Sequence, residues 1–499
     1  MLSKAQFEQF AGDGYNRIPL VVELLADLET PLSTYLKLCA APYGFLLESL
    51  HGGETWGRYS IIGLPCKERL EITGNELKHI ANGCLLSETT VADPLAAIRD
   101  FQAQYKVPVL PELPRFSGGL VGYFGYNTIH FAEPEWLRRS CRAPARKAID
   151  VPDIVLLLAE ELIVFDNLSG RLNLIVHANP EHENAYDKAC ERLQVLTDKL
   201  HAPLLLPEEP SHSQESKFEP QLDSFTEEAF KQAVERCLEY IRAGDAFQIV
   251  LSQRMCADFD VPPIALYRAL RTLNPSPYMF FVDFEAFQIA SSSPEILARS
   301  LDGKVTLRPL AGTRRRGQTP EEDLELEKDL LADPKEIAEH LMLIDLGRND
   351  VGRVSKFGSV EVTEKMRIER YSHVMHIVSN VEGSLKGDMD GLDVLKACFP
   401  AGTLSGAPKL RALEIIEELE PDQRGIYSGA IGYLGWHGNM DTAIAIRTAI
   451  IKDKKLHVQA GAGIVADSVP ANEWQETLNK SRAIFAAAEL ACRGFQQPL

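Results

Sequence analysis

The sequence predicts an α+β fold with extensive antiparallel sheet. Strand-like segments occur in clusters along the chain, and helices are interspersed among them irregularly. No repeat with a period of 20 to 50 residues is present, which argues against a solenoid or a propeller. Clustered strands with irregular helices favour antiparallel sheet over a regular βαβ array.

Composition restricts the classes of function. A chain of 499 residues predicts two or three domains or one large composite unit, and 45% hydrophobic with 25% charged residues is typical of a globular core. The net charge of −19 disfavours binding to nucleic acid or to an anionic membrane. An anionic substrate would therefore need a local metal ion, a placed arginine or backbone N–H groups.

Cysteine usage and the N-terminus predict a cytoplasmic protein. The nine cysteines form no C-x-x-C pair and show no metal-ligand spacing, as expected of reduced thiols. The N-terminus lacks the apolar region of a signal peptide, and the longest apolar run, Ile154 to Ala159, is too short to span a bilayer. Neither export nor membrane insertion is expected.

The first 200 residues contain recognisable helix and strand signals. The glycines of Gly118 to Asn127 are better explained by close strand packing than by a dinucleotide-binding turn, because no helix signal follows them. The other expected elements are a helix over PLSTYLKL, a strand at Phe45 to Ser49, a helix at Pro94 to Tyr105, strands flanking the turn Asp166 to Gly170, and a helix at Glu181 to Leu200.

A segment rich in proline, serine and glutamate divides the chain. We assign residues 1–205 to an N-terminal region, 206–222 to a linker and 223–499 to a C-terminal region. After the linker, Ser224 and Glu227 suggest a capping box for a helix that ends at Gly244. A strand over FQIVLSQRM, a helix over IALYRALRTL and several strand-like segments, including DTAIAIRTAII, follow.

Two carboxylate pairs are candidates for a metal site. Glu336 and Glu339 lie three residues apart in a predicted helix from Asp333 to Asn349, and Glu473 and Glu476 repeat the spacing near the C-terminus. Residues at this spacing share one helix face. Converging carboxylates would repel unless a hard cation such as Mg²⁺ lay between them. Two separate, solvated pairs are the alternative interpretation.

Other polar residues leave two interpretations open. Arg447, among apolar neighbours in AIAIRTAI, predicts either a salt bridge on a sheet face or an anion site. His376 is either a core histidine or a site residue, and Glu295 follows a tight turn that could bury its carboxyl group as a general acid. The N–H groups of Gly461 and Gly463 could hold a carboxylate or simply form a turn. Phe399 to Lys409 resembles a phosphate loop but lacks the required lysine and hydroxyl positions.

Taken together, these segments resemble the chorismate-utilising enzymes. The resemblance covers residues 225 to 485, and the whole chain is similar to the branch of that family that forms anthranilate. It implies a sandwich of antiparallel sheets with helices outside, the chorismate-binding enzyme fold. The matching segments, in order, are GDAFQIVLSQR, SSSPE, RPLAGTRRRG, ADPKEIAEHLMLIDLGRND, SHVMHIVS, FPAGTLSGAPK, AIRT and AGAGIVADSVPANEWQET.

The resemblance implies how a dianionic substrate is bound. Glu339 and Glu476 would hold Mg²⁺, which would chelate the ring carboxylate of chorismate, and Glu336 and Glu473 would orient the water ligands of the metal. Groups that would grip the enolpyruvyl carboxylate or line the same pocket are Arg447, Tyr427, the backbone of Gly461, Ala462 and Gly463, and Gly312 with Thr313.

The resemblance also implies the reaction. Glu295 would protonate the departing 4-hydroxyl as ammonia adds at C2, with His376 and Thr403 near the ring. Gln248 stands where water-adding relatives have a basic lysine, which favours ammonia as the nucleophile. Ala311 stands where aminodeoxychorismate synthases have a nucleophilic lysine, which favours a 2-amino product and, after loss of pyruvate, anthranilate.

Two further segments resemble the tryptophan feedback pocket of this family. LLES and NPSPYMF would place Ser49, Pro277, Tyr278 and Met279 around the amino acid. They lie on opposite sides of the predicted linker, so a ligand between them could alter how the two regions pack. The resemblance thus implies the first step of tryptophan biosynthesis with feedback inhibition by L-tryptophan.

The source of ammonia is expected to be a partner. No cysteine lies in the G-x-C-x-G turn of an amidotransferase, so a separate glutaminase subunit, or ammonia from solution, would supply the nucleophile. The alternatives are an aminodeoxychorismate synthase component, which Ala311 and the intact LLES oppose, and a non-catalytic tryptophan sensor or scaffold. The non-catalytic alternative is opposed by the presence of all four glutamates, Arg447 and His376.

Overall fold

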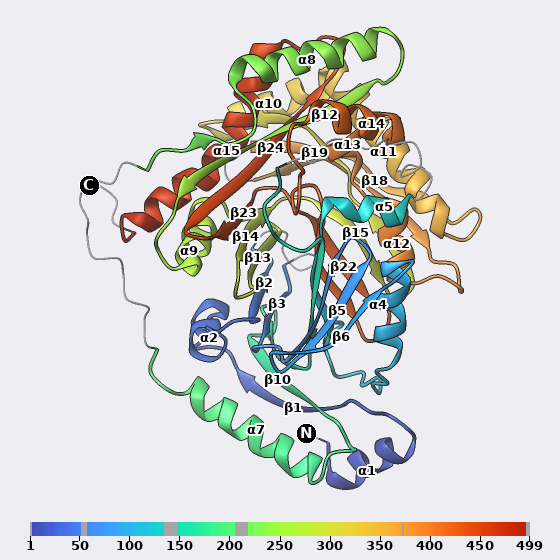
Figure 1. Ribbon diagram of the computed structural model, residues 1–499, viewed down its shortest axis with the longest axis vertical. Coiled ribbons are helices and arrows are strands. Elements are labelled where there is room, and N and C mark those ends of the chain that lie inside the picture. Colours follow the sequence, from blue (N-terminus) through green and yellow to red (C-terminus); the bar gives the residue numbers. More distant parts are fainter. Residues whose placement is uncertain (1, 51–56, 134–146, 205–217, 372–373, 496–499) are drawn as a thin grey trace.

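Two large antiparallel sheets pack face to face and helices cover their outer faces (Figure 1). The computed structural model describes residues 2–50, 57–133, 147–204, 218–371 and 374–495. Within these residues each sheet has 12 strands. The predicted α+β sandwich is therefore confirmed.

The first sheet carries the C-terminal strands that later form one wall of the site. Its short strand β20 (Gly406–Ala407) pairs with β12 beside the main order. That order is β1 (Ile18–Leu25), β10 (Arg171–Ala178), β9 (Glu161–Asp166), β3 (Tyr59–Gly63), β2 (Phe45–Glu48), β13 (Tyr278–Asp283), β14 (Gln288–Ser293), β23 (Thr448–Lys452), β24 (Lys455–Ile464), β12 (Gln248–Asp258) and β11 (Gln221–Leu222).

The second sheet is organised in the same way. Its strand β18 (Glu361–Arg370) pairs with β19 beside the main order. That order is β17 (Leu310–Arg315), β19 (Val374–Ser384), β16 (Lys304–Leu307), β15 (Ile296–Leu301), β22 (Met440–Ile444), β21 (Ala430–Gly435), β7 (Gly119–Phe124), β8 (Ile154–Ala159), β4 (Glu68–Thr73), β5 (Glu76–Ala81) and β6 (Cys84–Thr90).

Each sheet is a composite of strands from the two sides of the predicted linker. Strands β1 to β10 form one half of each sheet and strands β11 to β24 form the other. The halves meet where β2 pairs with β13, for example Leu47 with Phe280, and where β7 pairs with β21. We call these two pairings the seams. The predicted linker lies mostly outside the described residues.

Apolar side chains fill the space between the sheets and the spaces beneath the helices. Residues of both sheets, among them Phe45, Val121 and Phe280, form the central core. The helices, which cover the outer faces and the end of the sandwich, are α1 (Lys4–Gly12), α2 (Pro31–Leu38), α4 (Pro94–Ala103), α5 (Ile129–Ala132), α7 (Ala185–Leu200), α8 (Glu227–Arg242), α9 (Pro263–Leu273), α10 (Pro320–Ala332), α11 (Pro334–Val354), α12 (Gly391–Cys398), α13 (Gly402–Ser405), α14 (Lys409–Leu419) and α15 (Pro470–Cys492), with a 3-10 turn at Tyr126–Thr128.

Close packing explains the glycines of β7, as predicted. A Cβ atom on Gly122 would lie 1.9 Å from the Val155 carbonyl oxygen of β8, so any larger residue would push the two strands apart. Among the helices of the described ranges, none combines the length and the apolar character needed to cross a bilayer.

Several local predictions were wrong. The N-cap of α8 is Thr226, whose hydroxyl accepts from Ala229 N–H, whereas the Ser224 hydroxyl accepts from Arg254 N–H on β12. Helix α7 begins at Ala185, four residues later than expected. The segment DTAIAIRTAII is two strands, β22 and β23, in different sheets. Tertiary hydrogen bonds and the change of sheet override signals that are local in sequence.

Candidate active site

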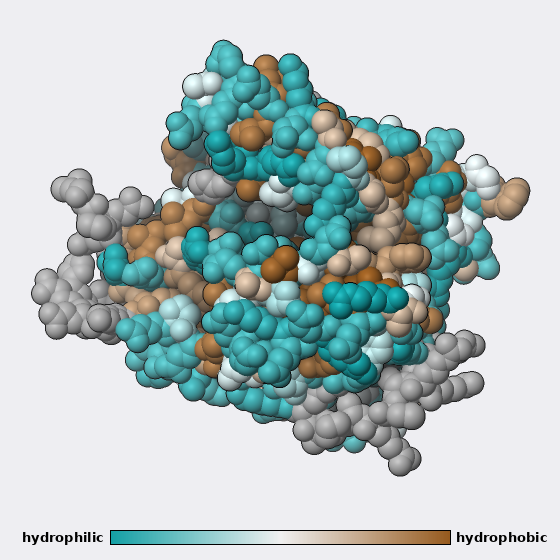
Figure 2. Space-filling view, turned by 90° about the horizontal axis from the view of Figure 1, so that it is seen from above, coloured by the Kyte–Doolittle hydropathy of each residue, from teal (hydrophilic) through white to brown (hydrophobic). Residues whose placement is uncertain are grey.

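The residues predicted for catalysis, chorismate binding and metal binding line one cavity of about 590 Å³. It lies between β12 and β24 of the first sheet and β17 and β19 of the second, with α11 and α15 at its rim. Seen from above, the molecular surface is hollowed at this end of the sandwich (Figure 2). The predicted residues that line the cavity are Gln248, Glu295, Gly312, Thr313, Glu336, Glu339, His376, Thr403, Tyr427, Arg447, Gly461, Gly463, Glu473 and Glu476.

Ala462 is the exception among the predicted residues. Successive side chains of a strand point to opposite faces. The Ala462 side chain consequently lies in the core cluster beneath α8, while Gly461 and Gly463 on either side line the cavity.

Two adjacent crossovers between the sheets place key side chains. The chain leaves the first sheet at Ser293 and enters the second at Ile296, and it returns between Ile444 and Thr448. The crossovers are tied together, since Ile444 N–H donates to the Glu295 carbonyl over 3.0 Å and Ser292 N–H donates to the Arg447 carbonyl over 3.0 Å. Glu295 and Arg447, which lie in these crossovers, both line the cavity.

Arg447 is a partly buried cation without an acidic partner in the described part of the chain. Burial lowers the pKa of its guanidinium group, and its backbone is left-handed with φ of 50°. Strained backbone at a non-glycine residue persists where the surroundings demand it, often at functional sites. Because no salt bridge is found here, the anion-site interpretation of Arg447 is favoured.

Glu295 is held as a protonated acid. Its side chain is 8% exposed, and burial raises its pKa to about 8. The Thr403 hydroxyl donates to its Oε1 atom over 3.1 Å and lowers that pKa in part. A carboxyl group with a pKa near 8 carries a proton at neutral pH and can deliver it to a leaving group.

His376 is a neutral histidine with one free nitrogen. Its Nδ1 lies 3.1 Å from the Gly312 carbonyl oxygen, which can only accept, and 3.0 Å from the Thr313 hydroxyl, which can accept as well as donate. Both contacts are satisfied when Nδ1 carries the proton and Nε2 is the unprotonated atom. Burial lowers the pKa of His376 to about 4. Gly312 occupies a bulge with φ of 71°, and this turn exposes its carbonyl to the histidine.

Small residues on β24 make room for two polar side chains. A Cβ atom on Gly461 would lie 2.9 Å from the Tyr427 hydroxyl, and one on Gly463 would lie 2.8 Å from Gln248 Nε2. Gln248 in turn donates to Glu339 Oε1 over 2.9 Å. Its own Oε1 is buried without a hydrogen-bond partner among the described residues.

The four glutamates line the cavity as two pairs. The pKa of Glu336 is raised by burial and by Glu339, and that of Glu473 by burial and by Glu476. A cation would reduce the repulsion within each pair. Carboxylate oxygens suit Mg²⁺, whose remaining coordination positions are filled by water. No group of three or more possible metal-binding side chains is found within the described residues. The four carboxylates thus line one cavity without forming a preassembled ligand cluster, and a magnesium site at Glu339 and Glu476 stays a prediction.

Lys480 is a site residue that sequence reasoning missed. It lines the cavity, pairs with Glu476 over 2.8 Å and donates to the Gly461 carbonyl over 2.9 Å. The i,i+4 spacing from Glu476 on α15 was the available signal. Lys480 thus adds a second cation to the wall that carries Arg447.

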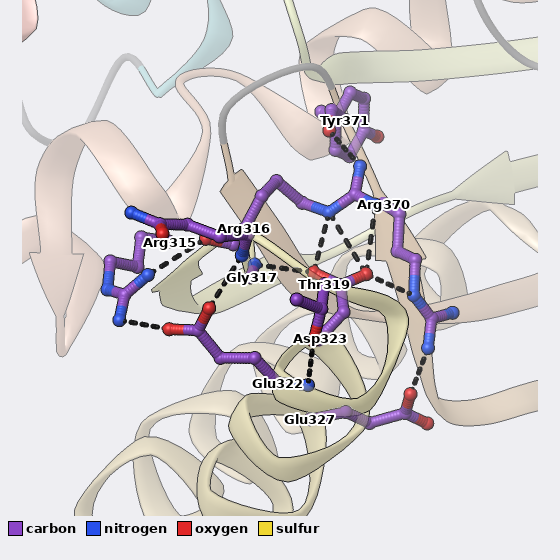
Figure 3. A network of polar contacts seen from close by, with 10 residues as sticks. Arg315, Arg316, Gly317, Thr319, Glu322, Asp323, Glu327, Arg370 and Tyr371 are labelled. Carbon is purple, nitrogen blue, oxygen red and sulfur yellow. Dashed lines mark hydrogen bonds and ion pairs between the residues drawn. The ribbon is translucent and has the colours of Figure 1, made fainter.

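An ion-pair network anchors the loop that follows Thr313 (Figure 3). Asp323 at the start of α10 accepts from Arg316 Nε over 2.9 Å, from Gly317 N–H over 2.7 Å and from Arg370 Nε over 3.2 Å. Arg316 also donates to the Tyr371 carbonyl over 2.7 Å, and the Tyr371 ring packs edge-on against His376. The motif RPLAGTRRRG therefore joins the end of β17 to α10 and to the end of β18.

A second cavity, of about 360 Å³, lies at the seams. Ser49 at the end of β2, Pro277 and Tyr278 line it, together with Phe116 and Tyr433. The predicted segments LLES and NPSPYMF are adjacent strands, with Glu48 opposite Met279. The Met279 side chain, however, lies in the core on the other face of β13. We call this space the seam cavity.

Comparisons with known proteins agree with this architecture. A family model described as chorismate binding enzyme matches residues 50–486. Anthranilate synthase component 1 of Pseudomonas aeruginosa is 56% identical over 494 residues, with 98% of this chain and 99% of the relative covered. The crystal structure of anthranilate synthase component I from Streptococcus pneumoniae superposes with a TM-score of 0.76 at 37% identity, covering 93% of this chain and 99% of that one.

A more distant structure shares the fold alone. MenF, the menaquinone-specific isochorismate synthase from Escherichia coli, has a TM-score of 0.70 at 19% identity, covering 97% of this chain and 98% of that one. The cavity, the match over most of the chain and the full-length relative lead to one assignment. The chain belongs to the chorismate binding enzyme family.

Proposed function

We propose that this chain is the chorismate-converting component of an anthranilate synthase. The relatives that match over its full length carry that name. The observation that carries the proposal is the partly buried Arg447, without an acidic partner among the described residues, in a cavity that also holds two carboxylate pairs and a protonated Glu295. These groups match a substrate with two carboxylates and a hydroxyl leaving group.

Substrate binding divides the two carboxylates of chorismate between two ends of the cavity. Arg447, Tyr427 and the N–H groups near Gly461 would take the enolpyruvyl carboxylate through charge-assisted hydrogen bonds. Glu339 and Glu476 would hold Mg²⁺ against the ring carboxylate, with Glu336 and Glu473 orienting its waters. The ion would neutralise the repulsion between that carboxylate and the surrounding glutamates.

The first chemical step is displacement of the 4-hydroxyl. Ammonia forms a bond to C2, the ring double bonds shift, and the C4–O bond breaks as Glu295 transfers its proton to the departing oxygen, so that water leaves. The Thr403 hydroxyl then donates to the Glu295 carboxylate and stabilises it. Ala311 offers no nucleophile, so ammonia attacks the ring directly.

The second step is loss of pyruvate. The C2 proton is removed, the ring becomes aromatic, and the enolpyruvyl side chain leaves as pyruvate after protonation. The neutral His376, with its Nε2 free to accept, is suited to take a proton at this stage. The balance is chorismate and ammonia to anthranilate, pyruvate and water.

Ammonia comes from a glutaminase partner in this proposal. The eight described cysteines are free, and none of them lines the catalytic cavity. Burial raises the pKa of Cys237 to about 12, which makes it a poor nucleophile. The name component 1 of the relatives accords with a second component.

The seam cavity is proposed as the site of feedback inhibition by L-tryptophan. Ser49 and Tyr278 come from strands of the two halves, so an amino acid between them would bias how the halves pack. The aromatic side chains of Phe116 and Tyr433 suit an indole ring.

A fluorescence assay tests the proposal. The purified protein is incubated with chorismate, Mg²⁺ and an ammonium salt at mildly alkaline pH, with and without EDTA, and anthranilate emission is followed. We expect emission that depends on Mg²⁺ and needs no glutaminase. Chorismate consumption without emission would instead indicate an aminodeoxychorismate or isochorismate product. An absence of consumption would favour a tryptophan sensor.

A further inference from the structure

A buried ion pair lies directly behind the catalytic cavity. Arg424, in the loop between α14 and β21, is paired with Glu420 at the C-terminal end of α14, and their side chains are 1% and 3% exposed. The pair is bidentate, with Nε to Oε2 at 2.8 Å and Nη2 to Oε1 at 2.6 Å. Desolvation makes such pairs weak contributors to stability. The other contacts of Arg424 and Glu420 give the pair a role besides stability.

All five N–H groups of Arg424 have acceptors. Besides the two bonds to Glu420, Nη1 donates to the Leu404 carbonyl over 2.7 Å and to the Ser428 hydroxyl over 3.1 Å, and Nη2 donates to the Val250 carbonyl over 2.8 Å. Only a guanidinium fork can make this set, because a lysine presents three donors from a single point.

The acceptors belong to three separate pieces of the cavity wall. Leu404 follows Thr403, which donates to Glu295. Ser428 follows Tyr427, whose ring centroid lies 5.7 Å from the guanidinium carbon. Val250 lies on β12, two residues after Gln248. Leu404, Tyr427 and Val250 themselves line the cavity.

Glu420 extends the same arrangement to β24. Its Oε1 accepts from both the backbone N–H and the hydroxyl of Ser252, each over 2.8 Å. The Ser252 hydroxyl accepts from Gln459 Nε2 over 2.9 Å, and Gln459 lines the cavity. The buried pair thus connects α13, the Tyr427 loop, β12 and β24.

We propose that Arg424, held by Glu420, is a positioning residue for the reaction, fixing Thr403 against Glu295 and Tyr427 toward the substrate. The proposal rests on the proposed function, since it concerns how those groups act on chorismate. Arg424 itself does not touch the substrate.

The decisive variant is Arg424→Lys, which keeps the charge and removes the fork. We expect kcat/KM with ammonium to fall about 100-fold, as small misplacements of reacting groups can cause. KM should rise because Tyr427 is misplaced relative to the substrate. The value of kcat should fall because Thr403 is misplaced relative to Glu295. The alkaline limb of the pH profile of kcat should also move, because Thr403 affects the pKa of Glu295. A loss of folded protein alone would not move this limb.

Arg254→Lys is the matched control. The Arg254 side chain is 2% exposed and lies on the same strand β12, paired with Asp223 and Asp422, but it does not line the cavity. We expect a similar loss of thermal stability with kcat and KM within about threefold of wild type, as for a substitution away from the site. Equal kinetic effects of the two variants would overturn the proposal.

Glu420→Gln decides the question if Arg424→Lys does not fold. The amide keeps an acceptor for Ser252 but weakens the bidentate contact, and we expect kcat/KM to fall about tenfold, the loss of one good hydrogen bond. Wild-type kcat and KM in this variant would overturn the positioning role. A wild-type protein that forms no anthranilate would instead overturn the proposed function.

Discussion

The catalytic cavity and the seam cavity both lie between the two sheets, but they differ in how their charged side chains are paired. In the catalytic cavity Arg447 has no acidic partner among the described residues, and the carboxylates lie as neighbouring pairs. Within the described ranges, only Glu336 and Glu476 of these carboxylates contact a cation, Arg314 and Lys480 respectively. The arginines that line the seam cavity, Arg58, Arg115 and Arg299, are each paired with an aspartate.

This difference indicates what each cavity binds. A cavity with an arginine that has no acidic partner and with more carboxylates than cations is completed by an anionic ligand and a metal ion. A cavity whose charges are already paired selects its ligand by shape and by a few hydrogen bonds. In the seam cavity, Arg299, Asp441 and the Tyr278 hydroxyl form a closed set at 2.6–3.0 Å. The following predictions test this contrast.

Removal of a metal-binding carboxylate should have the largest effect. We expect Glu339→Ala or Glu476→Ala to lower turnover on the order of 10⁴-fold, because several kcal/mol of charge stabilisation are lost. Tryptophan binding, measured by calorimetry, should persist. Glu325→Ala, on the exposed face of α10, is the control. Loss of tryptophan binding together with turnover would mean that the cavities are not separate.

Arg447→Met should separate function from stability. Charge-assisted hydrogen bonds contribute about 1.5–3 kcal/mol each, so the loss of two should lower kcat/KM about 10³-fold. A partly desolvated cation without an acidic partner costs free energy, and the variant should unfold at the same or a higher temperature. A marked decrease in unfolding temperature would show that Arg447 has a structural partner after all.

The pH dependence should report on Glu295. Burial raises its pKa to about 8, so the acid is protonated below that pH and kcat should fall as pH rises through about 8. The rates must be compared at constant free ammonia, which itself increases with pH. Glu295→Gln should abolish this limb and lower kcat about 10²- to 10⁴-fold. A limb that survives in Glu295→Gln would assign the acid to another residue.

The seam cavity should yield the smallest catalytic effect. Ser49→Phe would fill part of it, and a clash of about 1.4 kcal/mol or more should raise the inhibition constant for tryptophan at least tenfold. The kcat and KM values for chorismate should stay within about twofold of wild type, because surface and cavity-rim changes away from a site cost little. Unchanged inhibition by tryptophan would show that the seam cavity is not the effector site.

Much of this site was predictable, but its assembly was not. The sequence indicated β12 and α11 by their apolar pattern. Glu295, His376 and Arg447 each left two interpretations open, and only the resemblance to the chorismate-utilising enzymes assigned their roles. The apolar pattern placed Arg447 inside a strand, whereas Arg447 lies in a crossover between sheets. Neither this crossover nor the contact of Arg424 with Val250 follows from local pattern, because both join segments more than 100 residues apart in sequence.

The side-chain direction along a strand also limited the predictions. Alternation places Gly461 and Gly463 in the cavity and Ala462 in the core, and it turns Met279 away from the seam cavity. Motif matching names consecutive residues together, whereas a strand sends every second side chain to the other face. Predictions of contact residues on strands therefore gain from separating the two faces.

The seams have a consequence for synthesis of the chain on the ribosome. The N-terminal half emerges first, with β2 and β7 lacking the neighbours β13 and β21 that follow much later in the sequence. Two unpaired strand edges are then exposed to other nascent chains, a known route to aggregation. Recombinant expression should accordingly improve at lower temperature or with added chaperones, and the two halves produced as separate polypeptides should be soluble only when they are made together.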